Sequence, residues 1–283
     1  MAADTRADVL GDVRGYLFDL DGTLVLGDRR NHGFRPLPGA LELTRWLDSH
    51  RIPFVVFTNG TIRSGRAYAH ILREIGFPLD DSSVLTPASS AVDTLLRRGQ
   101  RTVVVLGGAG LAEPLAAAGI EVLPPVGKPR ADAVLVGWYR ECTLENIEAA
   151  CHAIWQGATL YSSSQSLFFA SADGKVLGTS RLICGAITSV TGTRATVVGK
   201  PSSHALRAAC RRLGLRPAQV AVVGDDPQLE TPMARRGGAV AIAVDTGIGG
   251  TDGYASLPDH RRPHLRLAGV DQLLKLARKS HEL

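Results

Sequence analysis

The sequence predicts an α/β fold: a doubly wound, parallel-sheet core into which a large second α/β domain is inserted. Two observations support this prediction. Short apolar runs rich in β-branched residues alternate with segments of helical periodicity, which is the pattern of βαβ units around a parallel sheet. The middle third of the chain differs from its flanks, with proline breaks and paired short strands, which indicates a domain of its own.

The individual elements follow from local signals. The predicted strands are, in chain order, Tyr16 to Asp19, Phe54 to Thr58, Val84 to Thr86, Thr102 to Leu106, Ala133 to Val136, Thr196 to Val198, Val220 to Val223 and Ala239 to Val244. Helices lie between them. Ser64 can cap a helix that Gly76 stops. Thr143 can cap another, which Gly157 stops.

The inserted domain is predicted over residues 88–190, and the core over 1–87 and 191–283. The insert holds the Pro124-Pro125 break and a serine cluster from Ser162 to Ser166. Two short strands, around Phe168 and over Lys175 to Leu177, are separated by the Asp173-Gly174 turn signal, which predicts a hairpin.

The charge balance does not predict a nucleic-acid partner. The 283 residues carry 32 Lys+Arg against 27 Asp+Glu, a formal net charge of +5. There are only five lysines, the arginines occur singly or in pairs, and no run of four basic residues exists. A solvated basic surface explains this pattern better than a stripe that tracks phosphates.

The sequence also predicts a cytoplasmic protein without a membrane span. The longest stretch free of Asp, Glu, Lys and Arg, residues 149–172, contains five serines, which a bilayer interior would penalise. The first residues show no apolar signal-peptide core. The four cysteines lack C-x-x-C spacing, which is typical of a reducing compartment.

Four polar motifs follow four of the predicted strands: Asp19-Leu20-Asp21, Thr58-Asn59, Lys200-Pro201 and Asp225-Asp226. The carboxyl ends of the strands in an open parallel sheet lie along one edge, so residues nearly two hundred positions apart can share one crevice. We therefore expect these four motifs to form a single site.

The residue types at this site indicate phosphoryl chemistry. The carboxylates of Asp19, Asp21 and Asp225 repel one another unless a cation joins them, and oxygen ligands of this kind suit Mg²⁺. Lys200, Thr58 and backbone N–H groups then offer positive charge and donors to a phosphoryl dianion. Asp19 could attack phosphorus to give an aspartyl-phosphate, and Asp21 could act as the general acid and base.

These motifs resemble those of the haloacid dehalogenase superfamily, in the subgroup whose large α/β cap is inserted after the second motif. That subgroup includes p-nitrophenyl phosphatase-like, phosphoglycolate phosphatase-like and pyridoxal phosphatase-like enzymes. The resemblance runs from about Val13 to Leu276. It implies a Rossmann-like core and a cap, and the second Asp of Asp19-Leu20-Asp21, Asp21, is typical of the phosphoryl-transfer branch.

The resemblance also implies the role of each residue. Asp19 matches the nucleophile and Asp21 the acid/base. Thr58 and Asn59 match the phosphate-binding segment, and Lys200 matches the charge-neutralising lysine. The resemblance assigns Mg²⁺ to Asp19, to Asp225 and to the backbone carbonyl of Asp21. Caps of this subgroup often form dimer contacts, so it further implies a homodimer through the cap.

The chain departs from the family pattern at three places. Gly60 stands where relatives often carry a second Asn, Glu230 stands where they carry Asp, and Ser163 to Ser166 replaces a cap loop that typically reads Thr-Asn-x-Asp. The substrate is therefore not predicted beyond a small phosphate ester. Further candidates for contacts with the substrate or the catalytic residues are Asp226, Glu230, Arg63, Ser164 and Arg181.

The predicted function is a Mg²⁺-dependent phosphatase that acts on a small phosphorylated metabolite. Two alternatives remain open: a phosphomutase or phosphotransferase of the same superfamily, and a non-catalytic phosphate-sensing module. The motif Val-Gly-Lys-Pro occurs twice, at 126–129 and 198–201. Lys200 is the expected catalytic lysine because it lies between a strand and a helix, whereas Lys128 lies in a proline-rich turn.

Overall fold

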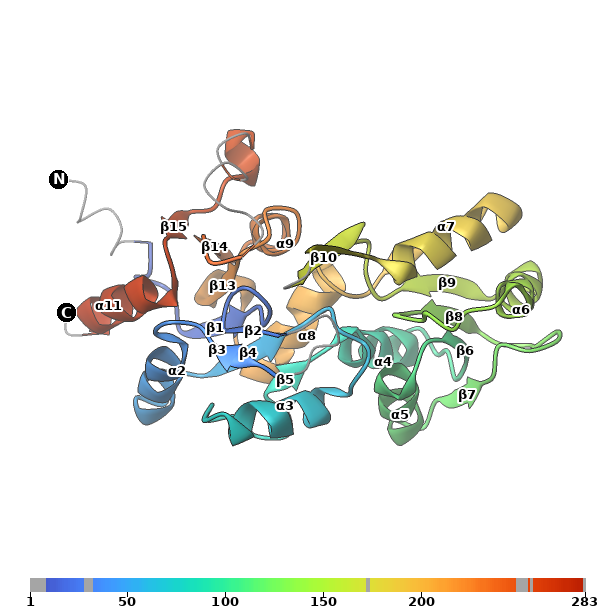
Figure 1. Ribbon diagram of the computed structural model, residues 1–283, viewed down its shortest axis with the longest axis horizontal. Coiled ribbons are helices and arrows are strands. Elements are labelled where there is room, and N and C mark those ends of the chain that lie inside the picture. Colours follow the sequence, from blue (N-terminus) through green and yellow to red (C-terminus); the bar gives the residue numbers. More distant parts are fainter. Residues whose placement is uncertain (1–8, 28–32, 172–173, 248–253, 255–256, 282–283) are drawn as a thin grey trace.

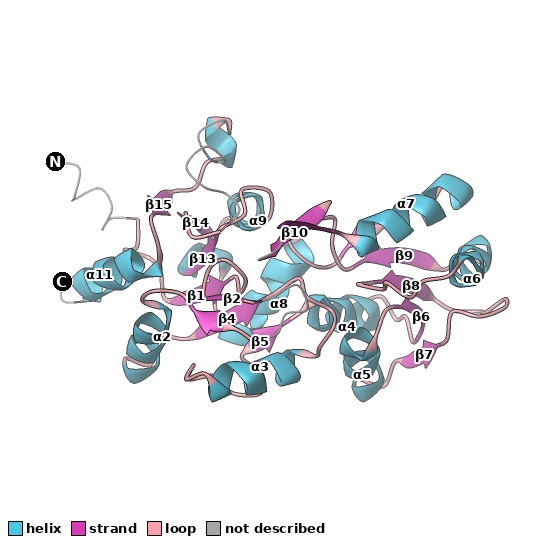
Figure 2. Cartoon of the chain, in the orientation of Figure 1, coloured by secondary structure: helices cyan, strands magenta, loops and turns pink. Residues whose placement is uncertain are grey.

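The computed structural model describes residues 9–27, 33–171, 174–247, 254 and 257–281. Two parallel sheets form the frame of the molecule, one on each side, and helices flank both (Figure 1; Figure 2). The predicted fold class, a doubly wound parallel-sheet core with a second α/β unit, is therefore confirmed.

The core sheet has six strands, all paired in parallel. Their spatial order is β15 (Leu265–Leu267), β14 (Val240–Val244), β13 (Val220–Gly224), β1 (Gly15–Phe18), β4 (Phe54–Phe57) and β5 (Val84–Leu85). Strand β1 thus lies between β13 and β4, which brings the residues after these three strands to one edge of the sheet.

Consecutive residues on these strands point to opposite faces of the core sheet, and both faces are covered. Phe18 and Val223 pack in one buried cluster with helices α2, α3 and α11. Leu17 and Val222 pack in another with helices α8 and α9. The helices are α2 (Ala40–Ser49), α3 (Gly65–Glu74), α8 (Ser203–Leu213), α9 (Glu230–Gly237) and α11 (Val270–His281).

The second sheet has five parallel strands and two helical layers of its own. Its order is β12 (Thr196–Val197), β9 (Thr159–Ser162), β8 (Ala133–Val136), β6 (Thr102–Leu106) and β7 (Glu121–Leu123). Its helices are α4 (Pro87–Arg97), α5 (Ala109–Ala117), α6 (Leu144–Trp155) and α7 (Thr179–Thr191). We call this unit the cap.

One strand prediction is wrong. The sequence assigned Thr196 to Val198 to the core, but β12 pairs in parallel with β9 of the cap sheet. The register joins Thr196 to Tyr161 and Val197 to Ser162. A two-residue β-branched run carries no sequence mark of which sheet it joins. Lys200 consequently follows a cap strand rather than a core strand.

Two antiparallel pairs complete the structure. The predicted hairpin is confirmed as β10 (Phe168–Ser171) paired with β11 (Gly174–Leu177), although the turn residue Asp173 lies outside the described residues. Strands β2 (Val25–Leu26) and β3 (Arg35–Pro36) form the other pair.

Both predicted helix caps are confirmed. Ser64 Oγ accepts a hydrogen bond from the N–H of Ala67, and Thr143 Oγ1 accepts one from the N–H of Asn146, each at 3.3 Å. None of the helices in the described part of the chain is both long enough and apolar enough to span a membrane.

Candidate active site

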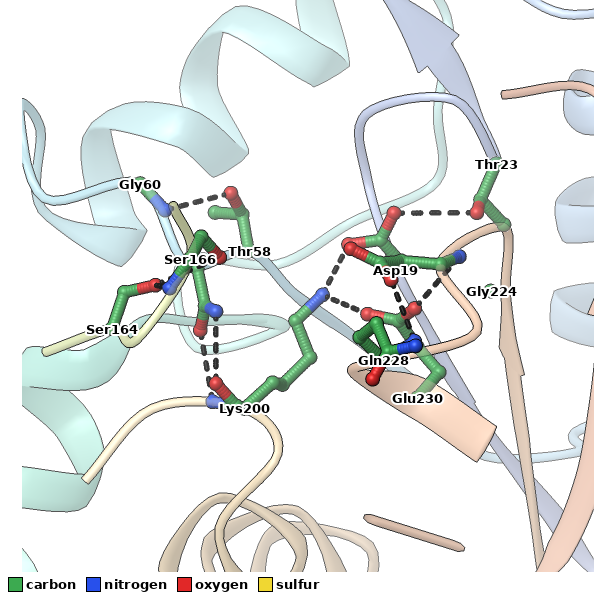
Figure 3. Close-up of polar contacts among 12 residues, drawn as sticks. Asp19, Thr23, Thr58, Gly60, Ser164, Ser166, Lys200, Gly224, Gln228 and Glu230 are labelled. Atoms are coloured by element: carbon green, nitrogen blue, oxygen red, sulfur yellow. Dashed lines mark hydrogen bonds and ion pairs between the residues drawn. The ribbon is translucent and has the colours of Figure 1, made fainter. Parts of the chain in front are cut away.

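Asp19 lies at the carboxyl edge of the core sheet, directly after β1. Its backbone N–H still donates to the carbonyl of Val223 on β13, at 2.8 Å, so the strand ladder fixes its position. Its carboxylate is buried. Oδ2 accepts a hydrogen bond from Thr23 Oγ1 at 3.3 Å, and Oδ1 forms an ion pair with Lys200 (Figure 3).

Lys200 is the cation of this site. Its side chain is only 2% exposed, and Nζ contacts both Asp19 and Glu230, the latter through Oε1 at 2.7 Å (Figure 3). Burial opposes the charged form, but the two carboxylates outweigh burial and raise the pKa of Lys200 above its ordinary value. Lys200 therefore stays protonated and is paired with the carboxylate of Asp19.

Glu230 begins helix α9 and is the second carboxylate that contacts Lys200. Its second oxygen, Oε2, accepts a hydrogen bond from the N–H of Asp226 at 3.1 Å. The Asp226 carboxylate accepts one from the N–H of Gln228 at 2.7 Å, and burial raises the pKa of Asp226. The longer Glu at this position thus reaches the lysine.

The carboxyl group of Asp21 has a pKa above its ordinary value. Burial is the larger cause and the negative charge of Asp19 the next, and together they raise the pKa of Asp21 to about 7. Lys200 and a hydrogen bond with Thr58 oppose this shift. Thr58 is itself buried at the end of β4, and its Oγ1 accepts a hydrogen bond from the N–H of Gly60 at 3.0 Å.

Asp225 follows β13 and is 2% exposed. Its carboxylate lies against two glycines, because a Cβ added to Gly22 or to Gly247 would collide with Oδ2. Gly22 has φ +83°, which favours glycine, and its carbonyl accepts a hydrogen bond from Thr246 Oγ1 at 2.5 Å. The cradle holds Asp225 beside the turn that carries Asp21.

The oxygen donors of this site fit Mg²⁺. The carboxylates of Asp19 and Asp225 and the backbone carbonyl of Asp21 are hard ligands of the type that Mg²⁺ takes. The negative charge of Asp19 is, after burial, a cause of the raised pKa of Asp21, and a cation bound here would offset that charge. Across the described ranges, no three His, Cys, Asp or Glu side chains are grouped so as to hold a metal by themselves.

The remaining predicted residues make other contacts. Asn59 bonds to the backbone of Lys200, with Nδ2 donating to the carbonyl at 3.1 Å and Oδ1 accepting from the N–H at 2.9 Å. Arg63 stacks over the ring of Tyr68, 5.8 Å from its centroid.

Ser164 lies in the cap loop formed by Ser163 to Ser166, and Arg181, on α7, bonds to the backbone of that loop. Ser164 Oγ donates to Ser166 Oγ at 3.0 Å, and Arg181 donates to the carbonyl of Gln165 at 3.1 Å. Figure 3 draws the serines together with Thr58 and Lys200. Thr23, which donates a hydrogen bond to Asp19, was not predicted from the sequence. The available signal was a hydroxyl residue four positions after Asp19, at the start of a tight turn.

Comparisons with known proteins agree with this geometry. Residues 16–121 match the family model described as haloacid dehalogenase-like hydrolase, and residues 197–273 match a second, HAD-hydrolase-like model. A 5′-nucleotidase of Bacillus subtilis is 27% identical over 83% of this chain and 88% of its own. An acid sugar phosphatase of Staphylococcus haemolyticus is 29% identical over 83% of this chain and 86% of its own.

Solved structures share the whole fold. A 4-nitrophenylphosphatase from Thermotoga maritima superposes with a TM-score of 0.84 at 25% identity, covering 94% of this chain and 98% of that one. A glycerol phosphate phosphatase from Mycobacterium tuberculosis, determined in complex with magnesium, superposes with a TM-score of 0.81 at 26% identity, covering 95% and 77%. These similarities extend over both the core and the cap.

Proposed function

Because this chain belongs to the haloacid dehalogenase superfamily and resembles relatives that hydrolyse phosphoric monoesters, we propose that it is a Mg²⁺-dependent phosphatase that transfers the phosphoryl group of a small metabolite to Asp19 and then to water. The observation that carries the proposal is the arrangement of Asp19, with Lys200 on its Oδ1 and Thr23 on its Oδ2. Two hydrogen-bonded oxygens fix the direction of the carboxylate before any substrate arrives.

In the first step a carboxylate oxygen of Asp19 attacks phosphorus. The bond between phosphorus and the ester oxygen breaks, and Asp21 gives its proton to that leaving oxygen. Burial raises the pKa of Asp21, which favours the protonated form that this step uses. The products of the step are a free alcohol and a phosphoryl group on Asp19.

In the second step Asp21, now a carboxylate, takes a proton from water, and the water oxygen attacks the phosphoryl group. The bond between phosphorus and Asp19 breaks, inorganic phosphate leaves, and both aspartates return to their starting forms. Lys200 faces the charge that develops on the phosphoryl oxygens in each step, from a buried position where that interaction is strong.

Asp19, Asp225 and the backbone carbonyl of Asp21 would hold the Mg²⁺. When bound, the metal supplies further positive charge to the phosphoryl oxygens. Its binding would also offset the repulsion between the carboxylates of Asp19 and Asp225.

The similarity to nucleotidases, sugar phosphatases and glycerol phosphate phosphatases supports a small phosphorylated metabolite as the substrate. The proposal places the enzyme in the cytoplasm, without a nucleic-acid or membrane partner. All four cysteines are free thiols, three of them buried, which suits a reducing compartment. Strand β12 lies beyond residue 190 and pairs within the cap sheet, so the proposed cap domain extends from Pro87 to Val197 rather than over residues 88–190.

A homodimer through the cap is part of the same proposal. Several large apolar side chains of the hairpin and of α7 are more than half exposed: Leu167, Leu177, Leu182 and Val190. Sedimentation of the purified protein tests this arrangement, and a monomer at micromolar concentration would contradict it.

A phosphate-release screen tests the function. The purified protein with Mg²⁺ is incubated with sugar phosphates, phosphoglycolate, glycerol phosphate, nucleotides and pyridoxal phosphate. Inorganic phosphate from at least one of them is the expected result. Transfer of the phosphoryl group to a second metabolite would identify a phosphotransferase or phosphomutase. No turnover of any phosphomonoester would favour a phosphate-sensing module.

A further inference from the structure

The backbone that carries Lys200 comes out of the cap sheet, not the core sheet. Strand β12 pairs with β9, and the ladder extends one residue further, where the N–H of Val198 donates to the carbonyl of Ser162 at 2.9 Å. Lys200 is only two residues beyond this bond. Its Nζ nevertheless reaches Asp19 at the edge of the core sheet. Lys200 thus lies in the short connection between β12 of the cap and α8 of the core, and contacts to the backbone of this connection help to set where the lysine lies.

Asn59 makes that connection. It follows β4 of the core sheet by two residues, and its side-chain amide forms two hydrogen bonds with the backbone of Lys200, one to the N–H and one to the carbonyl. The two bonds hold one residue from both sides, which fixes its orientation as well as its position.

Gly199 shows how tightly the parts meet. A Cβ at this residue would collide with the carbonyl oxygen of Ser163 in the cap loop, and it would lie 2.7 Å from Asn59 Oδ1 and 3.1 Å from Cγ of Pro87. Pro87 starts α4, the first helix of the cap. A core loop, a cap loop and both connections between the units thus converge on the residue before Lys200.

We propose that Asn59 is a positioning residue that acts through Lys200, and not a phosphate ligand as the sequence suggested. It ties the cap-borne lysine to the core, so that the ammonium group meets the phosphoryl group bound at Asp19. The inference rests on the proposed function and gives Asn59 a role within it. A displacement of about 1 Å in such a group is enough to lower the rate by about 100-fold.

A double-mutant cycle separates the two roles. Binding of orthovanadate, a phosphate mimic, is measured by calorimetry with Mg²⁺ present for the wild type, Asn59→Ala, Lys200→Ala and the double variant. We expect affinity losses of about 10-fold for Asn59→Ala and about 100-fold for Lys200→Ala. The double variant should bind no more weakly than Lys200→Ala, because Asn59 has nothing left to position. A loss of about 1,000-fold in the double variant would show that Asn59 touches the ligand itself and would overturn the proposal.

Amide hydrogen exchange gives a readout that does not depend on ligand or turnover. The Lys200 N–H, which donates to Asn59, should exchange at least about tenfold faster in Asn59→Ala than in the wild type. Asn146→Ala is the matched control, because Asn146 also bridges backbone groups, at Thr143 and Pro125, but within the cap. It should leave both exchange at Lys200 and vanadate affinity unchanged.

The outcomes are distinguishable. Unchanged exchange at Lys200 in Asn59→Ala would overturn the positioning role even if phosphatase activity is found. Absence of vanadate binding by the wild type would count against the proposed function, and the exchange measurement would still decide the role of Asn59. Should Asn59→Ala fail to fold, the isosteric Asn59→Asp, which keeps an acceptor for the Lys200 N–H and loses the donor to its carbonyl, takes its place in the cycle.

Discussion

The tetrapeptide Val-Gly-Lys-Pro occurs at residues 126–129 and at 198–201, in opposite surroundings. Lys128 is exposed, and a Cβ added to Gly127 would meet nothing within 4 Å. Lys200 is 2% exposed and contacts two carboxylates, and Gly199 is crowded by three segments. The two copies show that the fold, and not the neighbouring residues in sequence, decides whether a lysine is buried against carboxylates, since the residues next to it in sequence are the same.

Replacing the two lysines should give the largest difference. Lys200→Ala removes the buried positive charge that faces the phosphoryl group, so kcat/KM for p-nitrophenyl phosphate should fall by about 10³-fold. Lys128→Ala removes only a solvated charge and should leave kcat/KM within twofold of the wild type. Equal effects of the two substitutions on kcat/KM would contradict the different roles that we assign to Lys200 and Lys128.

Replacing the two glycines should separate activity from stability. Gly199→Ala should lower kcat/KM by about 100-fold, because the new Cβ displaces Lys200. Gly127 has φ +65°, so Gly127→Ala should destabilise the cap by about 1 kcal/mol through backbone strain and leave kcat/KM unchanged. Steady-state kinetics and thermal denaturation on both variants check this. An active Gly199→Ala enzyme would contradict the crowding that we describe.

Glu230 is one of the two carboxylates that distinguish the surroundings of Lys200 from those of Lys128. Glu230→Gln keeps the shape and the hydrogen bond from Asp226, but removes one of the two charges that hold Lys200, and kcat/KM should fall by about 10-fold. Glu148→Gln is the control, since Glu148 is 71% exposed and pairs with His152 on the same helix, α6. A Glu230→Gln enzyme with full activity would remove Glu230 from the positioning of Lys200.

The smallest expected effect is a pH-dependent change in stability caused by Asp21, an acidic residue near Lys200 that has no counterpart near Lys128. The pKa of Asp21 rises from 3.8 in the unfolded chain to about 7 in the metal-free folded protein, so the folded state binds this proton more tightly. The corresponding stability is present below pH 4 and is lost as the pH rises to 7. The melting temperature of Asp21→Asn, relative to the wild type, should therefore increase between pH 4.5 and 7.5 in EDTA. A constant difference would contradict the raised pKa.

Much of the fold and the site could be predicted from the sequence because their signals are local. Asp19, Thr58 and Asp225 each end a buried run of β-branched or aromatic residues, and parallel topology then brings the strand ends together. Pairing of β12 could not be predicted, since Thr196 and Val197 would suit an edge of either sheet. The side chain of Asn59 bonds to the backbone of Lys200, 141 positions away in sequence. Every residue other than proline has the same backbone groups, so the pattern of side chains could not predict this contact.

Phosphate release by the wild type and by Asp19→Asn, each with Mg²⁺ and after EDTA, tests whether the protein is a Mg²⁺-dependent phosphatase with Asp19 as its nucleophile. Asp259→Asn, which alters a side chain that is 92% exposed, is the control. We expect the wild type and the control to release phosphate with Mg²⁺, to release none after EDTA, and to recover activity when Mg²⁺ is restored. Asp19→Asn should release no phosphate from any substrate. Turnover by Asp19→Asn, or full activity of the wild type without a divalent ion, would contradict it.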